Sequence, residues 1–430
     1  MGATADIAAW IARTDDPPTP RAMRAAEHAV LDWAGVTLAA CGDPLVELLV
    51  ADAERGPSAV AGRPERLAPT AAARVMGAAS HALDFDDINK RMRGHPSVAI
   101  LPALLAAGDG DLADALVAGT EVAAILGEML GPAHYEHGFH TTATVGTVAA
   151  AAAVCRLRGA NHDTTARALS LAATQASGLR ATFGTMAKPL HAGFAAERGL
   201  RAAKWAIAGM SAPMDGIEHP QGFGPVLSAE FAARPIRPDA TAAFAIEENV
   251  FKHHAACYYA HSAMEAARRL GTEVDVQDIT GVTIGLQEPL LTVCDIVAPK
   301  TGLEVKFSVR HLVAMTLLGW DTTAPAAFTD ALAADPEISS LSRRITVKPL
   351  ETTNRMEAAI RIERGQDPRL EMRCDVSAPA QDLDEQEAAL IAKFARLTSP
   401  LLGNQTDAVA QVLLSAESAA SVLAALSTRS

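Results

Sequence analysis

The sequence predicts a mainly α-helical protein with a smaller α+β domain, and three observations lead to this prediction. The chain has 430 residues, and because a domain takes roughly 100–200 residues, this length predicts two domains. Hydrophobic residues make up 49% and charged residues 20%, a composition that buries a large core and excludes disorder, collagen-like repeats and coiled coil. Apolar residues recur at helical spacing up to about residue 245, and short β-branched runs follow.

The first predicted domain, residues 1–245, is an all-helical bundle. Thr19 and Pro20 have the residue types of an N-cap and a first-turn proline, so a helix is expected to begin there. Further helices are expected at residues 111–130, 144–159, 164–178 and 192–209. Gly131 and Pro132 are expected to end the first of these. Abundant Ala and Gly indicate that the helices approach one another closely.

The second predicted domain, residues 246–394, mixes strands and helices. Short β-branched runs with partial alternation are typical of strands, and they occur at residues 279–287, 343–350, 356–365 and 370–379. Helical patterns lie between them at residues 258–271 and 309–320. Residues 395–430 return to helical patterning, so we expect them to pack back on the first domain.

Charge and cysteine content exclude several classes of function. With 37 Lys and Arg against 50 Asp and Glu, the formal net charge is −13, so no nucleic-acid partner is expected, because phosphate binding needs a basic face. The five cysteines lack C-x-x-C spacing, which argues against zinc ribbons and iron–sulfur clusters. No signal-peptide pattern is recognised, and the most apolar window, residues 142–155, is typical of a buried helix. We therefore expect a cytoplasmic protein without a membrane partner.

The most informative stretch is SHALDFDDINKRMRGHPS. His81, Asp84 and Ile88 would share one face if this segment were helical. Carboxylates and cations crowd here, which is typical either of a solvated helix end or of a functional cluster. In the functional interpretation, Asp84 orients or protonates a group of the substrate, while Arg93 and His95 meet a substrate carboxylate.

The segment HYEHGFHTTATVG contains three histidines, and two interpretations are open. His134, His137 and His140 are expected on a loop, where they could ligate zinc, although the stricter H-E-x-x-H pattern is absent. Alternatively, His140 and Thr141 stand at the start of a helix, whose positive end favours an anion. They would then bind a substrate carboxylate.

The segment FGTMAKPLHAG places Lys188 directly before Pro189. Because the residue before proline disfavours the helical region, Lys188 is expected to be extended at the entry to a helix. An amine at the positive end of a helix is unfavourable unless an anion joins it. This pattern indicates a carboxylate pocket, and a lysine lying along the surface is the alternative interpretation.

The segment FKHHAACYYAHSAMEA combines Cys257 with several histidines ahead of a helix. A cysteine beside histidines suggests a thiol nucleophile, but a structural or substrate-lining role is the stronger interpretation. No G-x-S-x-G, Walker or G-x-G-x-x-G motif occurs. A nucleotide cofactor is therefore not expected.

Taken in order, HALDFDD, RGHPS, GFHTTATVG, QASGLRATFGTMAKPLHAG and CYYAH resemble the MmgE/PrpD family. This family includes 2-methylcitrate dehydratase, cis-aconitate decarboxylase and iminodisuccinate epimerase. The resemblance runs from about residue 20 to past residue 320. It implies a large all-helical domain, a smaller α+β lid domain, a homodimer and no cofactor.

The resemblance also implies which residues line the active-site cleft. The expected catalytic residues are Asp84, His95, His140, Lys188 and His261. The expected substrate-binding residues are Arg93, Thr141, His191 and Cys257, with the choice between Cys257 and His261 as the cleft-lining side chain left open. Dehydratase and decarboxylase members usually carry Thr after the DFDD-type motif, whereas this chain has Ile88. The segment MRGHPS resembles the epimerase branch of the family.

These activities share proton transfer at a carbon next to a carboxylate, a task that suits histidine because its ordinary pKa is near ~6.5. We therefore expect a cofactor-independent, metal-free lyase or isomerase acting on a small di- or tricarboxylate. A 2-methylcitrate dehydratase-like hydro-lyase is placed first, ahead of an epimerase and a decarboxylase. From another class, the alternative is a metallohydrolase using the three loop histidines or the carboxylates of residues 84–87.

Overall fold

The computed structural model of the chain describes all residues except 1, 14–16, 355, 366, 416–417 and 428–430. It divides into two compact units. The first comprises Met1–Phe251 and Pro379–Ser430, and the second comprises Lys252–Ala378. Each unit has its own buried apolar core.

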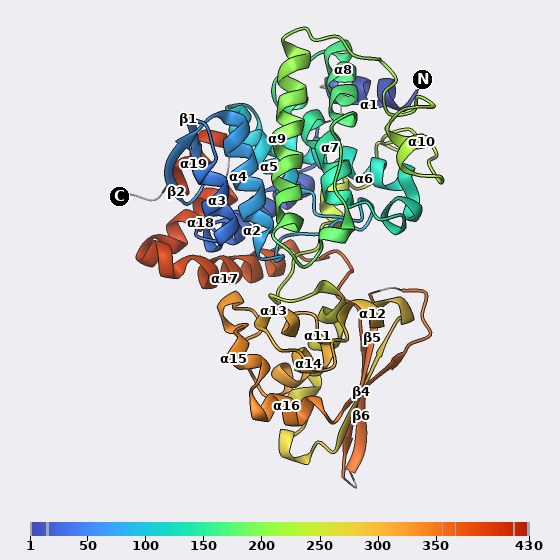
Figure 1. The fold of residues 1–430 in the computed structure, drawn as a ribbon, viewed down its shortest axis with the longest axis vertical. Helices are drawn as coiled ribbons and strands as arrows, with labels where there is room; N and C mark the ends of the chain where they lie inside the picture. Colours follow the sequence, from blue (N-terminus) through green and yellow to red (C-terminus); the bar gives the residue numbers. More distant parts are fainter. Residues whose placement is uncertain (1, 14–16, 355, 366, 416–417, 428–430) are drawn as a thin grey trace. The chain divides into compact units, whose positions relative to one another are not determined.

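The first unit is built almost entirely from helices (Figure 1). They are α1 (Ala3–Ala12), α2 (Pro20–Ala39), α3 (Pro44–Ala51), α4 (Pro69–Ala82), α5 (Ser97–Ala107), α6 (Leu112–Glu136), α7 (Thr141–Leu157), α8 (His162–Ala173), α9 (Ala187–Ile207), α10 (Phe223–Leu227), α17 (Leu383–Leu402), α18 (Thr406–Leu414) and α19 (Ala419–Ala425). α7 is central, because every residue from Thr141 to Cys155 is buried and α5, α6, α8 and α9 pack around it.

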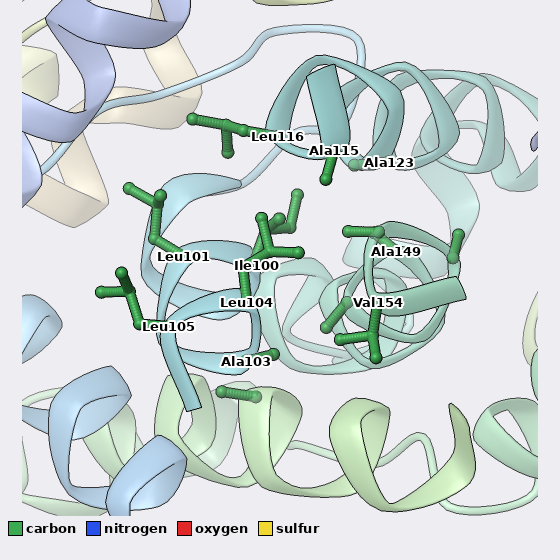
Figure 2. Close-up of a cluster of buried hydrophobic side chains, with 14 of the residues drawn as sticks. Ile100, Leu101, Ala103, Leu104, Leu105, Ala115, Leu116, Ala123, Ala149 and Val154 are labelled. Atoms are coloured by element: carbon green, nitrogen blue, oxygen red, sulfur yellow. The ribbon is translucent and has the colours of Figure 1, made fainter. Parts of the chain in front are cut away.

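Small residues allow this close packing. A Cβ atom on Gly199 of α9 would lie 2.7 Å from the carbonyl oxygen of Thr147 in α7. A Cβ atom on Gly146 of α7 would lie 2.8 Å from Cβ of Ala99 in α5. Both distances are shorter than ordinary contacts between packed atoms, so glycine sets how closely the helices approach. Figure 2 shows side chains of α5, α6 and α7 gathered in this core.

Two local features of the first unit differ from the sequence predictions. α6 does not end at Gly131 but continues to Glu136 across a kink, where Gly131 has a φ of 66°. His134 therefore lies in a helix rather than on a loop. A hairpin of β1 (Arg55–Val60) and β2 (Arg63–Leu67) interrupts the predicted all-helical domain. Its strands are short, polar and irregular in register, so no apolar alternation marks them in the sequence.

The C-terminal boundary of the smaller unit also differs from the predicted residue 394. α17 runs from Leu383 to Leu402 and packs on α2, which assigns residues 379–394 to the first unit. The predicted start of α2 is confirmed. The Thr19 side chain caps this helix by accepting a hydrogen bond from the Ala22 amide at 3.1 Å.

The second unit is an α+β domain, which confirms the predicted fold class. Its sheet has the order β4-β3-β5-β6, with β3 parallel to β4 and antiparallel to β5. In this register, Ile284 of β3 lies between Val347 of β4 and Ile360 of β5, and α11 packs on β5 and β6. The strands are β3 (Gly281–Leu286), β4 (Ile345–Pro349), β5 (Ala358–Arg364) and β6 (Asp367–Cys374). The helices are α11 (His261–Leu270), α12 (Leu291–Cys294), α13 (Gly302–Val305), α14 (Val309–Leu317), α15 (Asp330–Ala333) and α16 (Pro336–Ser342).

In the part of the chain that the structure describes, no single helix has both the length and the apolar character needed to cross a membrane. α2 and α3 satisfy these criteria only when they are taken together, and they are bent by 86° where they meet.

Candidate active site

The connection between α4 and α5 forms the centre of the candidate site. α4 ends at Ala82, so the predicted helical face shared by His81, Asp84 and Ile88 is wrong. Ile88 instead exchanges two backbone hydrogen bonds with Val250, each 2.9 Å long. Asp84 has a φ of 51°, a left-handed conformation that few residues other than glycine adopt. Backbone strain of this kind concentrates at functional sites.

Buried polar contacts fix the conformation of this connection. Asp87 accepts hydrogen bonds from Ser97 Oγ at 2.6 Å and from Asn249 Nδ2 at 2.8 Å. Lys393 of α17 donates to the Phe85 carbonyl oxygen at 2.7 Å and to Asp32 Oδ1 of α2 at 2.6 Å. Segments far apart in the sequence therefore hold the loop in place.

The Asp86 carboxylate lies between two imidazole rings. His81 Nδ1 is 2.9 Å from one carboxylate oxygen of Asp86, and His95 Nδ1 is 2.8 Å from the other. The same nitrogen of His95 lies 2.8 Å from the carbonyl oxygen of Asp87. The side chains of His81 and Asp86 are buried, whereas 14% of the His95 side chain is exposed. Of the two imidazoles, His95 is therefore the one that a ligand can reach.

A second pair of imidazoles lies beside the first. His140 Nδ1 is 3.1 Å from His191 Nδ1 of α9, and the His140 ring stacks near the His81 ring with 6.0 Å between centroids. His140 stands at the N-cap position of α7 without a side-chain capping bond, and its amide donates to the Gly178 carbonyl oxygen at 3.0 Å. One of the two facing nitrogens carries the shared hydrogen, so His191 helps to set the tautomer of His140.

Lys188 completes the site. Its ammonium nitrogen lies 2.9 Å from Asp84 Oδ2 and 5.5 Å from the centre of the Phe183 ring. The prediction that Lys188 is extended is wrong, since α9 begins at Ala187 and includes it. Proline is well tolerated in the first turn of a helix, so Pro189 does not unwind this one. The anion required beside an amine at a helix N-terminus is supplied here by Asp84.

Burial lowers the pKa values of His81, His140 and His191. It lowers the pKa of His81 to about 4, against the opposing charge of Asp86, and it holds the pKa of His140 well below its ordinary value. Burial also lowers the pKa of His191. Burial opposes ionisation of Asp86, but the adjacent His81 and His95 outweigh it and hold the Asp86 pKa well below its usual range. The site therefore contains an ionised carboxylate, Asp86, beside buried imidazoles whose pKa values are lowered.

Asp87 gives this site a testable pH dependence. Burial raises its pKa to about 7, although the Ser97 hydroxyl donates to it. The folded state therefore keeps a proton that an unfolded aspartate releases near ~3.9. The resulting contribution to stability is fully present below about pH 4 and is lost as the pH rises through about 7. We expect Asp87→Asn to gain stability relative to the wild type between pH 5 and pH 8, as measured by thermal unfolding at both pH values.

The matched control for this measurement is Asp52→Asn, because the Asp52 side chain is 79% exposed. This variant should follow the wild type at both pH values. A constant difference in stability between Asp87→Asn and the wild type would contradict the expected titration.

The substrate-binding residues predicted in the first unit, Thr141, Arg93 and His191, have different contacts in the structure. The Thr141 hydroxyl donates to the Arg93 carbonyl oxygen at 2.6 Å, so it holds the loop. The Arg93 guanidinium donates to the Gly127 carbonyl oxygen at 3.0 Å, and this residue is exposed. Only His191 joins the imidazole cluster directly.

The alternative interpretation of His134, His137 and His140 as a zinc site is not supported, since they do not form a ligand group among the described residues. His134 Nδ1 lies 3.0 Å from the Leu227 carbonyl oxygen, and its Nε2 lies 2.8 Å from Thr144 Oγ1. Both ring nitrogens of His134 are therefore paired within the protein.

Within the described ranges, one group of potential metal ligands does come together: His81, Asp84, Asp86 and His95, with ligand atoms that all lie within 4.8 Å of one another. Several of its donor atoms already face a partner within the protein. The Lys188 ammonium occupies Asp84, and the Nδ1 atoms of both imidazoles face Asp86. A cation would have to replace these contacts, so the donor set favours proton chemistry over metal binding.

His261 and Cys257 belong to the second unit, and their place in the site stays a prediction. His261 Nε2 lies 3.1 Å from the Ala256 carbonyl oxygen, and its ring centroid lies 5.2 Å from that of His254. Burial holds the pKa of His261 well below its ordinary value. Cys257 is also buried.

Sequence reasoning did not assign the roles of Asp86 and His81. Both residues stand in the HALDFDD motif, but the spacing drew attention to Asp84, which lies on the expected helical face. The signal that could have found them is a histidine at the end of a helix followed five residues later by an aspartate. This signal is weak without the turn that brings the two side chains together.

Two family models match the chain: the MmgE/PrpD N-terminal domain over residues 5–235 and the MmgE/PrpD C-terminal domain over residues 254–416. The cis-aconitate decarboxylase of Homo sapiens is 28% identical over 310 residues, which cover 68% of this chain but only 64% of the human protein. The cis-aconitate decarboxylase of Aspergillus terreus (strain NIH 2624 / FGSC A1156) is 28% identical over 388 residues, 80% of this chain and 78% of that protein. The 2-methylcitrate dehydratase of Cupriavidus necator is 28% identical over 354 residues, 75% of this chain and 72% of that protein.

Proposed function

This chain belongs to the MmgE/PrpD family, and on this premise we propose that it is a lyase acting on a small di- or tricarboxylate. The proposed reaction begins with proton transfer at a carbon next to a carboxylate and needs no cofactor. Elimination of water from a hydroxy acid, as in a 2-methylcitrate dehydratase, is the form we place first. Decarboxylation of an unsaturated acid of the cis-aconitate type is the nearest alternative.

One observation carries the proposal. His95, backed by the Asp86 carboxylate, and Lys188, paired with Asp84, belong to the same cluster. Elimination needs a base for the carbon-bound proton and an acid for the departing hydroxyl. The cluster contains a candidate for each, and a decarboxylation would need only the acid.

In the proposed step, His95 Nε2 takes the proton from the carbon next to a substrate carboxylate as that C–H bond breaks. The electron pair forms the new C=C bond, and the C–O bond to the hydroxyl breaks. Lys188, in its ammonium form, donates the proton with which the hydroxyl leaves as water. Before it donates that proton, its charge also stabilises the negative charge that develops on the carboxylate oxygens.

Epimerisation and metal-dependent hydrolysis would use the same cluster differently. Epimerisation of the iminodisuccinate type needs two proton carriers on opposite faces of one carbon, and His95 and His140 are the candidates. Ile88 removes the hydroxyl that dehydratase and decarboxylase members usually carry after the DFDD-type motif, and this substitution favours epimerisation. A metallohydrolase would use the ligand group around Asp86 instead.

The test is proton NMR in D₂O with metal-free protein and a panel of 2-methylcitrate, citrate, cis-aconitate, malate, tartrate and iminodisuccinate. We expect deuterium to enter a carbon next to a carboxylate, with loss of water as the net reaction. Loss of carbon dioxide, or exchange with inversion at carbon, would replace the dehydratase by the decarboxylase or the epimerase. Activity that appears only with near-stoichiometric zinc or manganese would contradict the metal-free proposal.

A homodimer and a cytoplasmic location follow from the resemblance and the sequence, and both stay proposals. Sedimentation analysis tests the dimer, and a stable monomer at the protein concentration of the activity assay would contradict it.

A further inference from the structure

We infer that Asp86 is a positioning residue that His81 and His95 share. It holds His81 in the tautomer whose Nε2 carries no hydrogen, and its charge supports the same tautomer of His95, which the Asp87 carbonyl oxygen also requires. His95 is thereby presented as a base, and His81 serves as a permanent hydrogen-bond donor to Asp86. The catalytic consequence of this inference rests on the proposed function. The tautomers themselves do not.

The contacts of His95 determine its tautomer. A carbonyl oxygen only accepts hydrogen bonds, and His95 Nδ1 lies 2.8 Å from the carbonyl oxygen of Asp87. Nδ1 must therefore carry the hydrogen, and Nε2 of the neutral ring must carry the lone pair. Asp86 Oδ2 also lies 2.8 Å from Nδ1 but is not hydrogen-bonded to it, so its negative charge favours the same tautomer through electrostatics alone.

The contacts of His81 give it a different task. His81 Nδ1 lies 2.9 Å from Asp86 Oδ1, and both side chains are buried. A buried carboxylate oxygen without a donor is costly, so the N–H of His81 allows Asp86 to stay ionised. His81 itself stays neutral, since burial lowers its pKa to about 4.

His81 and His95 therefore have different roles: His81 donates to Asp86, and His95 serves as the base. The His81 side chain is fully buried, whereas that of His95 is 14% exposed. Among the described residues, His81 Nε2 also has no hydrogen-bond partner, as expected of a ring that uses only its Nδ1 side. When His95 accepts a proton, the nearby negative charge of Asp86 stabilises the imidazolium that forms. This stabilisation is realised only as the proton is transferred, so it should act on kcat more than on KM.

The first test is Asp86→Asn. The amide has no charge, so it cannot stabilise the imidazolium that forms on His95. We expect kcat to fall by about 10²–10⁴ with a small change in KM, as for other groups that orient a catalytic histidine. Asp114→Asn is the matched control, because the Asp114 side chain is 19% exposed and pairs with Arg156 rather than with an imidazole, and its kcat should match that of the wild type.

The second test uses two replacements of His81. In His81→Asn, the amide nitrogen stands close to the position of Nδ1 and can still donate to Asp86, so kcat should stay within about threefold of the wild type. In His81→Leu, Asp86 loses its donor, and kcat should fall by about 10–100-fold, the order expected when a hydrogen bond to a buried charge is lost. A purely structural role of His81 would give equal losses in two variants with equal melting temperatures.

The third test does not depend on finding a substrate. In protein labelled with ¹⁵N-histidine, the ring-nitrogen chemical shifts report which nitrogen carries hydrogen, and His95→Asn assigns the resonances of His95. We expect a protonated Nδ1 and a bare Nε2 for His95 in the wild type. In Asp86→Asn, His95 should keep this tautomer because the Asp87 carbonyl oxygen still accepts from Nδ1, whereas the tautomer population of His81 should change. A wild-type His95 with hydrogen on Nε2 would overturn the inference. If no compound in the panel reacts, the proposed function fails, and these shifts still decide the role of Asp86.

Discussion

Replacing His95 by Asn is expected to lower turnover by about 10²–10⁴, the contribution of a well-placed general base. The Asn amide nitrogen lies near the position of Nδ1, so it can keep the contact to the Asp87 carbonyl oxygen. The variant loses only the second ring nitrogen, which takes the proton in the proposed step. The measurement is the initial rate of deuterium incorporation or product formation with whichever compound of the panel the wild type converts.

His162→Asn is the matched control for this experiment. His162 starts α8, its side chain is 40% exposed and it pairs with the neighbouring Asp163 rather than with the imidazole cluster. Its turnover should match that of the wild type. If His95→Asn retains the wild-type rate while folding normally, the base must be another residue, and His140 becomes the next candidate.

Replacing Lys393 by Met is expected to destabilise the first unit by about 3–5 kcal/mol, the cost of leaving a buried charge without its partner. Lys393 Nζ lies 2.6 Å from Asp32 Oδ1 and 3.9 Å from the centre of the Phe85 ring. The side chains of Lys393 and Asp32 are 6% and 1% exposed. Because Lys393 also donates to the Phe85 carbonyl oxygen, its loss should loosen the loop that carries Asp84 and Asp86.

Urea unfolding followed by tryptophan fluorescence measures this effect. Three of the four tryptophans, Trp10, Trp33 and Trp205, lie in the first unit, so the signal reports mainly on that unit. Asp32→Asn combined with Lys393→Met removes both charges and should recover part of the lost stability. Lys204→Met, at an exposed position of α9, should change little. A double variant as unstable as the single one would show that the uncompensated charge is not the cause.

The sequence alone was sufficient for the features that depend on neighbouring residues. The cap of α2 at Thr19 follows from residue type at a helix start, and the structure has the hydrogen bond that this prediction requires. The helical first unit and the α+β second unit follow from the period of apolar residues. The need for an anion beside Lys188 follows from the helix dipole, and Asp84 meets that need.

Local patterns failed where long-range contacts or special backbone angles decide the conformation. The positive φ of Gly131 allows α6 to continue through a kink, and α17 belongs to the first unit because it packs on α2. The turn after Ala82 leaves the helical path, with Asp84 in a left-handed conformation. This turn therefore places Asp86 beside the imidazoles of His81 and His95, whereas the expected helix would have aligned Asp84 with His81.

The sequence by itself predicted the segments that carry the candidate residues and the helices α7 and α9, at whose N-termini His140 and Lys188 lie, because capping, periodicity and charge next to a helix end are properties of short segments. Only the tertiary structure decided that Asp86 lies between His81 and His95. It also decided that Lys393 donates a hydrogen bond to the loop at Phe85, which is more than three hundred residues away in the sequence. The physical reason is burial. A carboxylate or an ammonium withdrawn from water must find its partner in space, and spacing along the sequence does not reveal which distant side chain that partner is.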